Sequence, residues 1–159
     1  MTNVIVVSGR RNSGKTTWVC ALAATLRERG LRVGSLKHTH HDCLPPGKDS
    51  TRHLEAGAAR VVLVTPTGAI RYESWDEEPT LDRLLRTEFA GFDLVLVEGY
   101  RAEKAPRLIV GDDPEADTTH LLRRVPEAPA LTRALVAEVA DLILAAIGGD
   151  HGDRAFPPG

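Results

Sequence analysis

The chain has 159 residues, enough for one domain that buries roughly two thirds of the surface its unfolded form exposes. Its 20 basic and 22 acidic residues leave a net charge of −2, so no overall positive field would attract nucleic acid or an anionic membrane. Two cysteines cannot make a secreted disulfide framework, and no apolar run approaches the roughly 20 residues of a membrane helix. We therefore expect a cytoplasmic protein with an aliphatic core.

The first predicted elements are a strand, a glycine-rich turn and a helix. An apolar run at residues 4–7 ends in Ser8, and the chain then reads GRRNSGKTT over residues 9–17. This matches GxxxxGK[ST], the phosphate-binding loop in which successive backbone N–H groups and a lysine surround the oxygens of a nucleotide. We predict that the nucleotide is bound by Gly9, Arg10, Arg11, Asn12, Ser13, Gly14, Lys15, Thr16 and Thr17.

Two side chains of this loop have separate predicted roles. Lys15 is expected to place its ammonium near the β- and γ-phosphates, and the hydroxyl of Thr16 is expected to bind Mg²⁺. A dinucleotide-binding turn is a poorer match, because it requires GxGxxG and Arg11 occupies the third position. The residues of the loop therefore predict a site for a nucleoside triphosphate with Mg²⁺.

The next elements alternate between helix and strand. Apolar side chains recur at helical spacing over residues 16–29, and residues 31–37 read as a second strand. A strand, a helix and a strand of this total length predict a right-handed parallel crossover. Trp18 and Cys20, which fall in the helix, are expected to be packing residues, as is Trp75 further along the chain.

A polar stretch follows the second strand, at the edge where open α/β sheets bind ligands. Residues 37–43 read KHTHHDC, with three histidines and a cysteine within six residues. A metal site, contact with a substrate or phosphate, and a solvated loop are three open interpretations. Adjacent His40 and His41 would point to opposite sides of an extended segment, and no CxxC pair completes a tetrahedral site. We therefore favour contact with a substrate or phosphate.

Three elements are predicted in the middle of the chain. Asp49 or Ser50 can cap a short helix, and residues 60–65 and 69–72 form an antiparallel strand pair. A second amphipathic helix covers residues 76–89. The strand pair is expected to add an antiparallel element to a mostly parallel sheet.

An apolar strand over residues 93–98 carries an acidic residue at its carboxyl end. Its run of apolar side chains predicts a strand buried on both faces. Held beside the phosphate loop, Glu98 can bind Mg²⁺ directly or through water, whereas Asp93, at the other end of the strand, is expected to be structural. Arg101 has two open interpretations, a contact to an anionic substrate or partner protein and a solvated surface base.

The remaining elements are a strand at residues 108–110 and a helix at residues 131–147. We predict a single nucleotide-binding domain over residues 1–149 and a flexible tail over residues 150–159. The predicted fold class is α/β, a P-loop NTPase-like three-layer sandwich with a mostly parallel sheet and an antiparallel strand pair.

Taken in order, these motifs resemble those of the MobB family. The matching stretches are GxxxxGKTT, KHTHHD from residue 37, PGKDS from residue 46 with Arg52, AGA from residue 56, and Asp93 with VEGY from residue 97. The resemblance implies a homodimeric, GTP-binding adaptor of molybdenum cofactor biosynthesis with weak Mg²⁺-dependent GTPase activity at most. Such a protein assists the MobA-type nucleotidyltransferase, which attaches GMP to molybdopterin to form molybdopterin guanine dinucleotide.

The resemblance also assigns roles to individual residues. Glu98 matches the acid that follows the later strand, and with Thr16 it would hold Mg²⁺. A polar group near the site would contact molybdopterin or the partner enzyme, and it consists of His38, His40, His41, Asp42, Lys48, Asp49, Ser50 and Arg52, to which we add Arg101. No guanine-reading NKxD or TKxD motif is present in the sequence, so GTP rather than ATP is implied by the resemblance alone.

Two other functions use the same loop. A small-molecule kinase would need an arginine-bearing lid, and the pair Arg123 and Arg124 lies in no predicted lid helix. A nickel-insertion GTPase would account for the histidines, but the sequence has neither a guanine motif nor a Cys-Pro-His-like metal pair. The adaptor is therefore the preferred hypothesis.

Overall fold

The computed structural model describes residues 3–41 and 48–148. The chain divides into two compact units, one formed by Met1–His38 and Leu84–Gly159 and the other by Thr39–Arg83. Asp42, Cys43 and the tail predicted at residues 150–159 lie outside the described residues. In the described ranges, no helix combines the length and the apolar character needed to cross a membrane.

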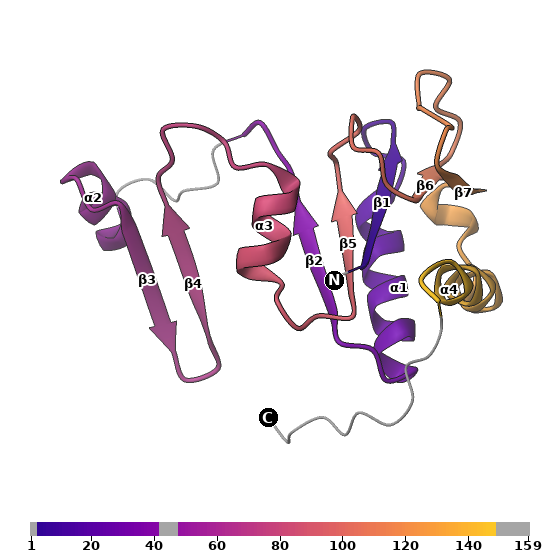
Figure 1. The fold of residues 1–159 in the computed structure, drawn as a ribbon, viewed down its shortest axis with the longest axis horizontal. Helices are drawn as coiled ribbons and strands as arrows, with labels where there is room; N and C mark the ends of the chain where they lie inside the picture. Colours follow the sequence, from indigo (N-terminus) through magenta and orange to yellow (C-terminus); the bar gives the residue numbers. More distant parts are fainter. Residues whose placement is uncertain (1–2, 42–47, 149–159) are drawn as a thin grey trace. The chain divides into compact units, whose positions relative to one another are not determined.

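The first unit is built on a five-stranded sheet in which all neighbouring pairs are parallel (Figure 1). Its strands are β1 (Asn3–Gly9), β2 (Val33–Lys37), β5 (Leu94–Glu98), β6 (Arg107–Val110) and β7 (Leu121–Val125), in the order β2-β5-β1-β6-β7. The predicted α/β fold class, with a mostly parallel sheet and an antiparallel pair, is confirmed. β7 was not predicted, because two arginines interrupt its short apolar pattern and remove the signal of a buried strand.

The register of the sheet brings three strand ends together. Val7 of β1 is paired with Glu98 of β5, and Glu98 is paired in turn with Lys37 of β2. Strands joined by parallel crossovers end at the same edge of a sheet. The last residues of β2 and β5 are therefore direct neighbours beside the turn that follows β1.

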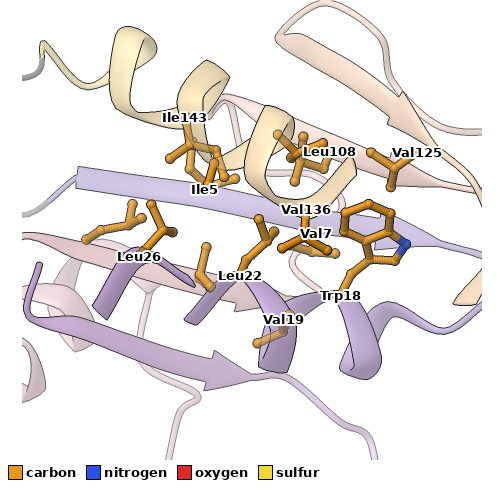
Figure 2. Packing of buried hydrophobic residues seen from close by; sticks show 14 of the residues in the cluster. Ile5, Val7, Trp18, Val19, Leu22, Leu26, Leu108, Val125, Val136 and Ile143 are labelled. Carbon is orange, nitrogen blue, oxygen red and sulfur yellow. The ribbon is translucent and has the colours of Figure 1, made fainter. Parts of the chain in front are cut away.

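Helices α1 (Lys15–Glu28) and α4 (Arg133–Ala146) supply the apolar side chains that cover one face of this sheet. Figure 2 shows side chains of β1, β6 and both helices meeting in one cluster. Its labelled members are Ile5, Val7, Trp18, Val19, Leu22, Leu26, Leu108, Val125, Val136 and Ile143. Complete burial of one such side chain contributes roughly 1.5 to 3 kcal/mol, so this cluster is the main stabilising feature of the unit.

The burial pattern of α1 agrees with one packing prediction and corrects another. Trp18 is fully buried and packs in the core, as predicted, but Cys20 is exposed. The side chains of α1 that face the sheet come from positions 18, 19, 22 and 26, and residue 20 lies about 200° around the helix from residue 18. The prediction that Cys20 is buried was therefore wrong.

The second unit contains helix α2 (Asp49–Glu55) and a separate two-stranded antiparallel sheet formed by β3 (Arg60–Thr65) and β4 (Gly68–Glu73). The predicted hairpin is present, as a sheet of its own rather than as part of the parallel sheet. Lys48 occupies the N-cap position of α2 without a side-chain cap, so the predicted capping by Asp49 or Ser50 was wrong. Both residues lie inside the helix.

Two further predictions about the middle of the chain need correction. Helix α3 (Leu81–Glu88) is shorter than the helix predicted over residues 76–89, since Pro79 disfavours helical geometry at the residue before it. Trp75 has 49% of its surface exposed and is not a packing residue of the described chain. Its exposure is shared by other large side chains of the second unit.

Candidate functional site

The turn between β1 and α1 depends on its two glycines. Gly9 and Gly14 have φ angles of +145° and +94°, which residues with a Cβ atom rarely adopt. A Cβ at Gly9 would lie 2.5 Å from the carbonyl oxygen of Val110, and one at Gly14 would lie 2.3 Å from the Cβ of Ala128. The chain can therefore pass through this tight turn only because both positions lack a side chain.

A short 3₁₀ helix, η1 (Ala128–Ala130), supports the turn from the carboxyl-terminal part of the chain. The backbone N–H of Ala128 donates to the carbonyl oxygen of Ser13 at 3.3 Å. The indole N–H of Trp18 donates to the carbonyl oxygen of Pro126 at 2.8 Å. These contacts join residues more than a hundred positions apart, so the sequence carried no local signal for this support.

Lys15, the lysine of the motif, folds back onto its own loop. Its Nζ donates to the carbonyl oxygens of Gly9 at 3.1 Å and Arg10 at 2.6 Å. Burial lowers the pKa of Lys15, and the nearby carboxylate of Glu98 partly offsets this effect. Because a desolvated ammonium gains from an anionic partner, phosphate oxygens can replace these two carbonyl contacts.

Glu98 lies beside the first turn of α1. It continues the face of β5 that carries Leu96, which α1 covers, so its carboxylate points towards the start of that helix. Thr16 Oγ1 donates to Glu98 Oε2 at 2.8 Å. The structure thus brings together the two residues predicted to bind Mg²⁺.

A third side chain completes this group. Lys37 Nζ lies 3.2 Å from Glu98 Oε1 and 3.5 Å from Thr16 Oγ1. A hydroxyl and a carboxylate are hard oxygen ligands of the kind Mg²⁺ takes when phosphates and water complete its shell. The ammonium of Lys37 shows that this oxygen pair accepts a cation, so the residues fit the ion. In the described ranges, no cluster of three or more His, Cys, Asp or Glu side chains could hold a metal by itself.

Arg101 is anchored at the base of the phosphate loop, although 51% of its side chain is exposed. Its NH2 group donates to the carbonyl oxygen of Gly9 at 2.8 Å and to Asp113 Oδ2 at 2.8 Å. Asp113 has only 2% of its surface exposed. Arg107, also buried, donates from NH1 to the carbonyl oxygen of Arg101 at 3.0 Å. Asp113 and Arg107 were not predicted from the sequence, because each contacts Arg101 only in the folded chain.

His38 directly follows β2 and packs next to Glu98. Its backbone N–H donates to the carbonyl oxygen of Glu98 at 2.9 Å, and its ring centroid lies 4.7 Å from that of Tyr100. Gly99, with a φ of +104°, allows this approach, since a Cβ there would lie 3.0 Å from the Cβ of His38. Among the histidines of the polar stretch, His38 belongs to the same unit as the loop.

The other predicted polar residues belong to the second unit, and their roles stay predictions. These are His40, His41, Lys48, Asp49, Ser50 and Arg52. Arg52 and Asp49 form an i,i+3 ion pair at 4.0 Å on the surface of α2, with 73% and 94% of their side chains exposed. An ion pair this exposed contributes little to stability, so both groups are available to other partners.

The family described as MobB, molybdopterin guanine dinucleotide synthesis protein B, matches residues 4–141 of this chain. The chain belongs to the MobB family. The matched residues include the phosphate loop, Glu98, Arg101 and Asp113.

Individual MobB relatives agree with this membership. The chain is 34% identical over 137 residues to the molybdopterin-guanine dinucleotide biosynthesis adapter protein of Escherichia coli K12, covering 83% of this chain and 74% of that protein. It is 32% identical over 120 residues to the probable adapter protein of Bacillus subtilis 168, covering 70% of this chain and 66% of that protein.

Solved MobB structures share the fold. A crystal structure of molybdopterin-guanine biosynthesis protein B is 27% identical, with a TM-score of 0.68 over 91% of this chain and 98% of that chain. Bacillus subtilis MobB is 23% identical, with a TM-score of 0.71 over 93% and 99% of the two chains. The second match shows the common fold alone.

Proposed function

We propose that this protein is a GTP-binding adaptor in the formation of molybdopterin guanine dinucleotide, which assists the MobA-type nucleotidyltransferase. One observation carries the proposal: a glycine-dependent phosphate loop lies next to an oxygen pair, Thr16 and Glu98, in a member of the MobB family. The adapter role is the one named for the curated relatives from Escherichia coli and Bacillus subtilis. The preference for GTP over ATP is inferred from the resemblance to the MobB family alone.

Each residue of the loop has a defined part in this proposal. The backbone N–H groups between Gly9 and Thr17 would receive the phosphate oxygens, and Lys15 would exchange its loop carbonyls for the β- and γ-phosphates. Thr16 and Glu98 would hold Mg²⁺, which neutralises phosphate charge when it is bound. Any hydrolysis is expected to be slow, because Glu98 would be occupied by Mg²⁺ and would not be free to activate water.

We also propose that the protein acts as a homodimer and that the β3–β4 hairpin takes part in the contact. Large exposed hydrophobic side chains of the described chain come from this region: Val62, Leu63, Val64, Ile70 and Trp75. Leu63 and Ile70 form a cross-strand pair, while Val62 and Val64 lie on the opposite face of the sheet. An isolated two-stranded sheet is only marginally stable in water, so these side chains favour a covering partner.

Reconstitution of cofactor synthesis tests the adaptor role. The transferase, molybdopterin and GTP should give more guanine dinucleotide cofactor when the wild-type protein is added. Lys15→Ala should remove most of that stimulation, whereas Lys104→Ala, which removes an exposed lysine outside the loop, should retain it. Equal product yield with wild type, either variant or no added protein would overturn the proposed function. Calorimetry with GTP and with ATP, each with Mg²⁺, separately tests binding and base preference.

A further inference from the structure

Lys37 reaches into the candidate Mg²⁺ site from a neighbouring strand. It is the last residue of β2 and is paired in register with Glu98, the last residue of β5. Its ammonium lies 3.2 Å from one carboxylate oxygen of Glu98, while Thr16 donates to the other at 2.8 Å. The side chain of Glu98 is 12% exposed, whereas that of Lys37 is 60% exposed. A flexible, largely solvated cation thus neutralises a nearly buried anion.

We propose that Lys37 is an internal counter-ion of the Mg²⁺ site, which neutralises Glu98 while the metal is absent and is displaced when Mg²⁺ binds. This inference rests on the proposed function, since it assumes that Thr16 and Glu98 bind Mg²⁺ with the nucleotide. It adds a role for a residue outside the phosphate loop and outside the proposed ligand pair. The consequence is a nucleotide site that does not present an uncompensated carboxylate to the phosphates.

The geometry sets the two cations in competition. Lys37 Nζ lies 3.2 Å from Glu98 Oε1 and 3.5 Å from Thr16 Oγ1, so an ion held by these two residues would lie close to the ammonium. A lysine and a divalent cation this close repel each other strongly. Because most of the Lys37 side chain is already in water, its ammonium can move into solvent at small cost.

The other cations near the phosphate loop are held in different ways. Lys15 donates to two loop carbonyls and is the lysine proposed to bind the phosphates. Its charge interacts with those of Glu98, Lys37, Arg101 and Asp113. Arg101 is tied to Gly9 and to buried Asp113. Within the described residues Lys37 has no such second anchor, and its contacts are with Thr16 and Glu98. It is therefore the cation that can leave when Mg²⁺ arrives.

The test compares nucleotide affinity with and without Mg²⁺ in matched variants. A fluorescent GTP analogue is titrated into wild type, Lys37→Met, Lys37→Arg and Lys104→Met, first with EDTA and then with saturating Mg²⁺. Without Mg²⁺, Lys37→Met should bind roughly three- to tenfold more weakly than wild type, because Glu98 then repels the phosphates. With Mg²⁺ the two should agree within about twofold. Lys37→Arg keeps the charge and should behave as wild type, as should Lys104→Met.

A second measurement reads the metal directly. Mn²⁺ can replace Mg²⁺ on oxygen ligands, and the loss of its free-ion EPR signal reports binding. With nucleotide bound, Lys37→Met should bind Mn²⁺ more tightly than wild type, since no ammonium competes for Glu98. This readout is independent of any catalytic activity.

The outcomes separate this inference from the proposed function. If Lys37→Met weakens nucleotide binding equally with and without Mg²⁺, Lys37 contacts the nucleotide itself and the counter-ion role is overturned. If it changes neither affinity nor Mn²⁺ binding, the role is overturned as well. In both cases wild type still binds the Mg²⁺ complex. If wild type binds neither nucleotide nor Mn²⁺, the proposed function fails and the inference fails with it.

Discussion

The two compact units of the chain use their apolar side chains in opposite ways. In the first unit, the central strands β1 and β5 carry side chains such as Ile5, Val6 and Leu96 with no exposed surface. In the second unit, Val62 and Val64 of β3 are 51% and 76% exposed. A buried sheet holds catalytic or binding groups rigidly at its strand ends, whereas an apolar hairpin gains stability from whatever covers it. We infer that nucleotide binding belongs to the first unit and self-association to the second.

The largest expected effect comes from truncating the same residue type in each unit. Leu22→Ala removes a fully buried side chain from the core and should lower the free energy of unfolding by about 2 to 5 kcal/mol. Leu63→Ala removes a side chain that is 46% exposed and should cost less than about 1 kcal/mol in the monomer. Urea denaturation at low protein concentration measures both values. Sedimentation at higher concentration should show weaker self-association for Leu63→Ala, and similar losses of stability in both variants would contradict the comparison.

Alanine substitutions at two glycines with similar φ angles should separate the stability cost of a steric clash from that of backbone strain. Gly14 and Gly57 have φ angles of +94° and +101°, but an added Cβ lies 2.3 Å from Ala128 at Gly14 and meets no atom within 4 Å at Gly57. Gly57→Ala should therefore cost about 1 to 2 kcal/mol from strain alone. Gly14→Ala should cost roughly 2 to 4 kcal/mol, because η1 must also move. Thermal unfolding measures the difference in stability between the two variants. Equal losses would show that η1 does not pack tightly against the loop.

Substituting one lysine in each unit should separate the effects on nucleotide binding from the effects on partner contact. Lys15→Ala removes a charge-assisted phosphate contact and should weaken GTP binding by about 1.5 to 3 kcal/mol. Lys48→Ala, in the second unit, should leave the GTP dissociation constant within about twofold while lowering the yield of reconstituted cofactor synthesis. Calorimetry and the synthesis assay measure the two effects. A large loss of GTP affinity in Lys48→Ala would mean that both units contact the nucleotide.

The smallest expected effect is the dependence of stability on pH through Lys15. Burial lowers the pKa of Lys15, so between that lowered value and the ordinary value the unfolded chain binds more protons than the folded chain. Stability should therefore rise with pH across this alkaline window. Lys15→Met lacks the titrating group, and the stability of wild type relative to it should increase as pH rises. A parallel pH profile for the two proteins, measured by urea denaturation, would contradict this assignment.

Some features of the site could be predicted because their signals are local. A tight phosphate-binding turn needs glycine at particular neighbouring positions, and Gly9, Gly14, Lys15 and Thr16 occur within eight residues. The pattern of a strand buried on both faces that ends in an acid could also be predicted, and it placed Glu98 at the carboxyl end of β5. The α/β class followed from the alternation of helical and strand patterns.

Other features depend on the order of strands and on contacts between distant residues. The sequence does not state that β5 lies between β1 and β2, so the adjacency of Lys37 and Glu98 became visible only in the folded sheet. The same is true of Asp113, whose contact with Arg101 exists only in the folded chain. Cys20 and Trp75 were misjudged because residue type is a weak guide to burial when the packed face of an element is unknown.

The amino-acid sequence by itself determined the glycine-rich turn after β1, the class of fold and the acid at the end of β5, because short-range sterics and apolar periodicity act between neighbours along the chain. The tertiary structure alone decided which cations surround that acid. Lys37 meets Glu98 through parallel pairing of their strands, and the charge of Glu98 acts on Lys15. Arg101 reaches the carbonyl oxygen of Gly9 in the neighbouring turn, again from a distant part of the sequence. Charge around the site is therefore a property of the folded sheet, whereas the turn is a property of its own residues.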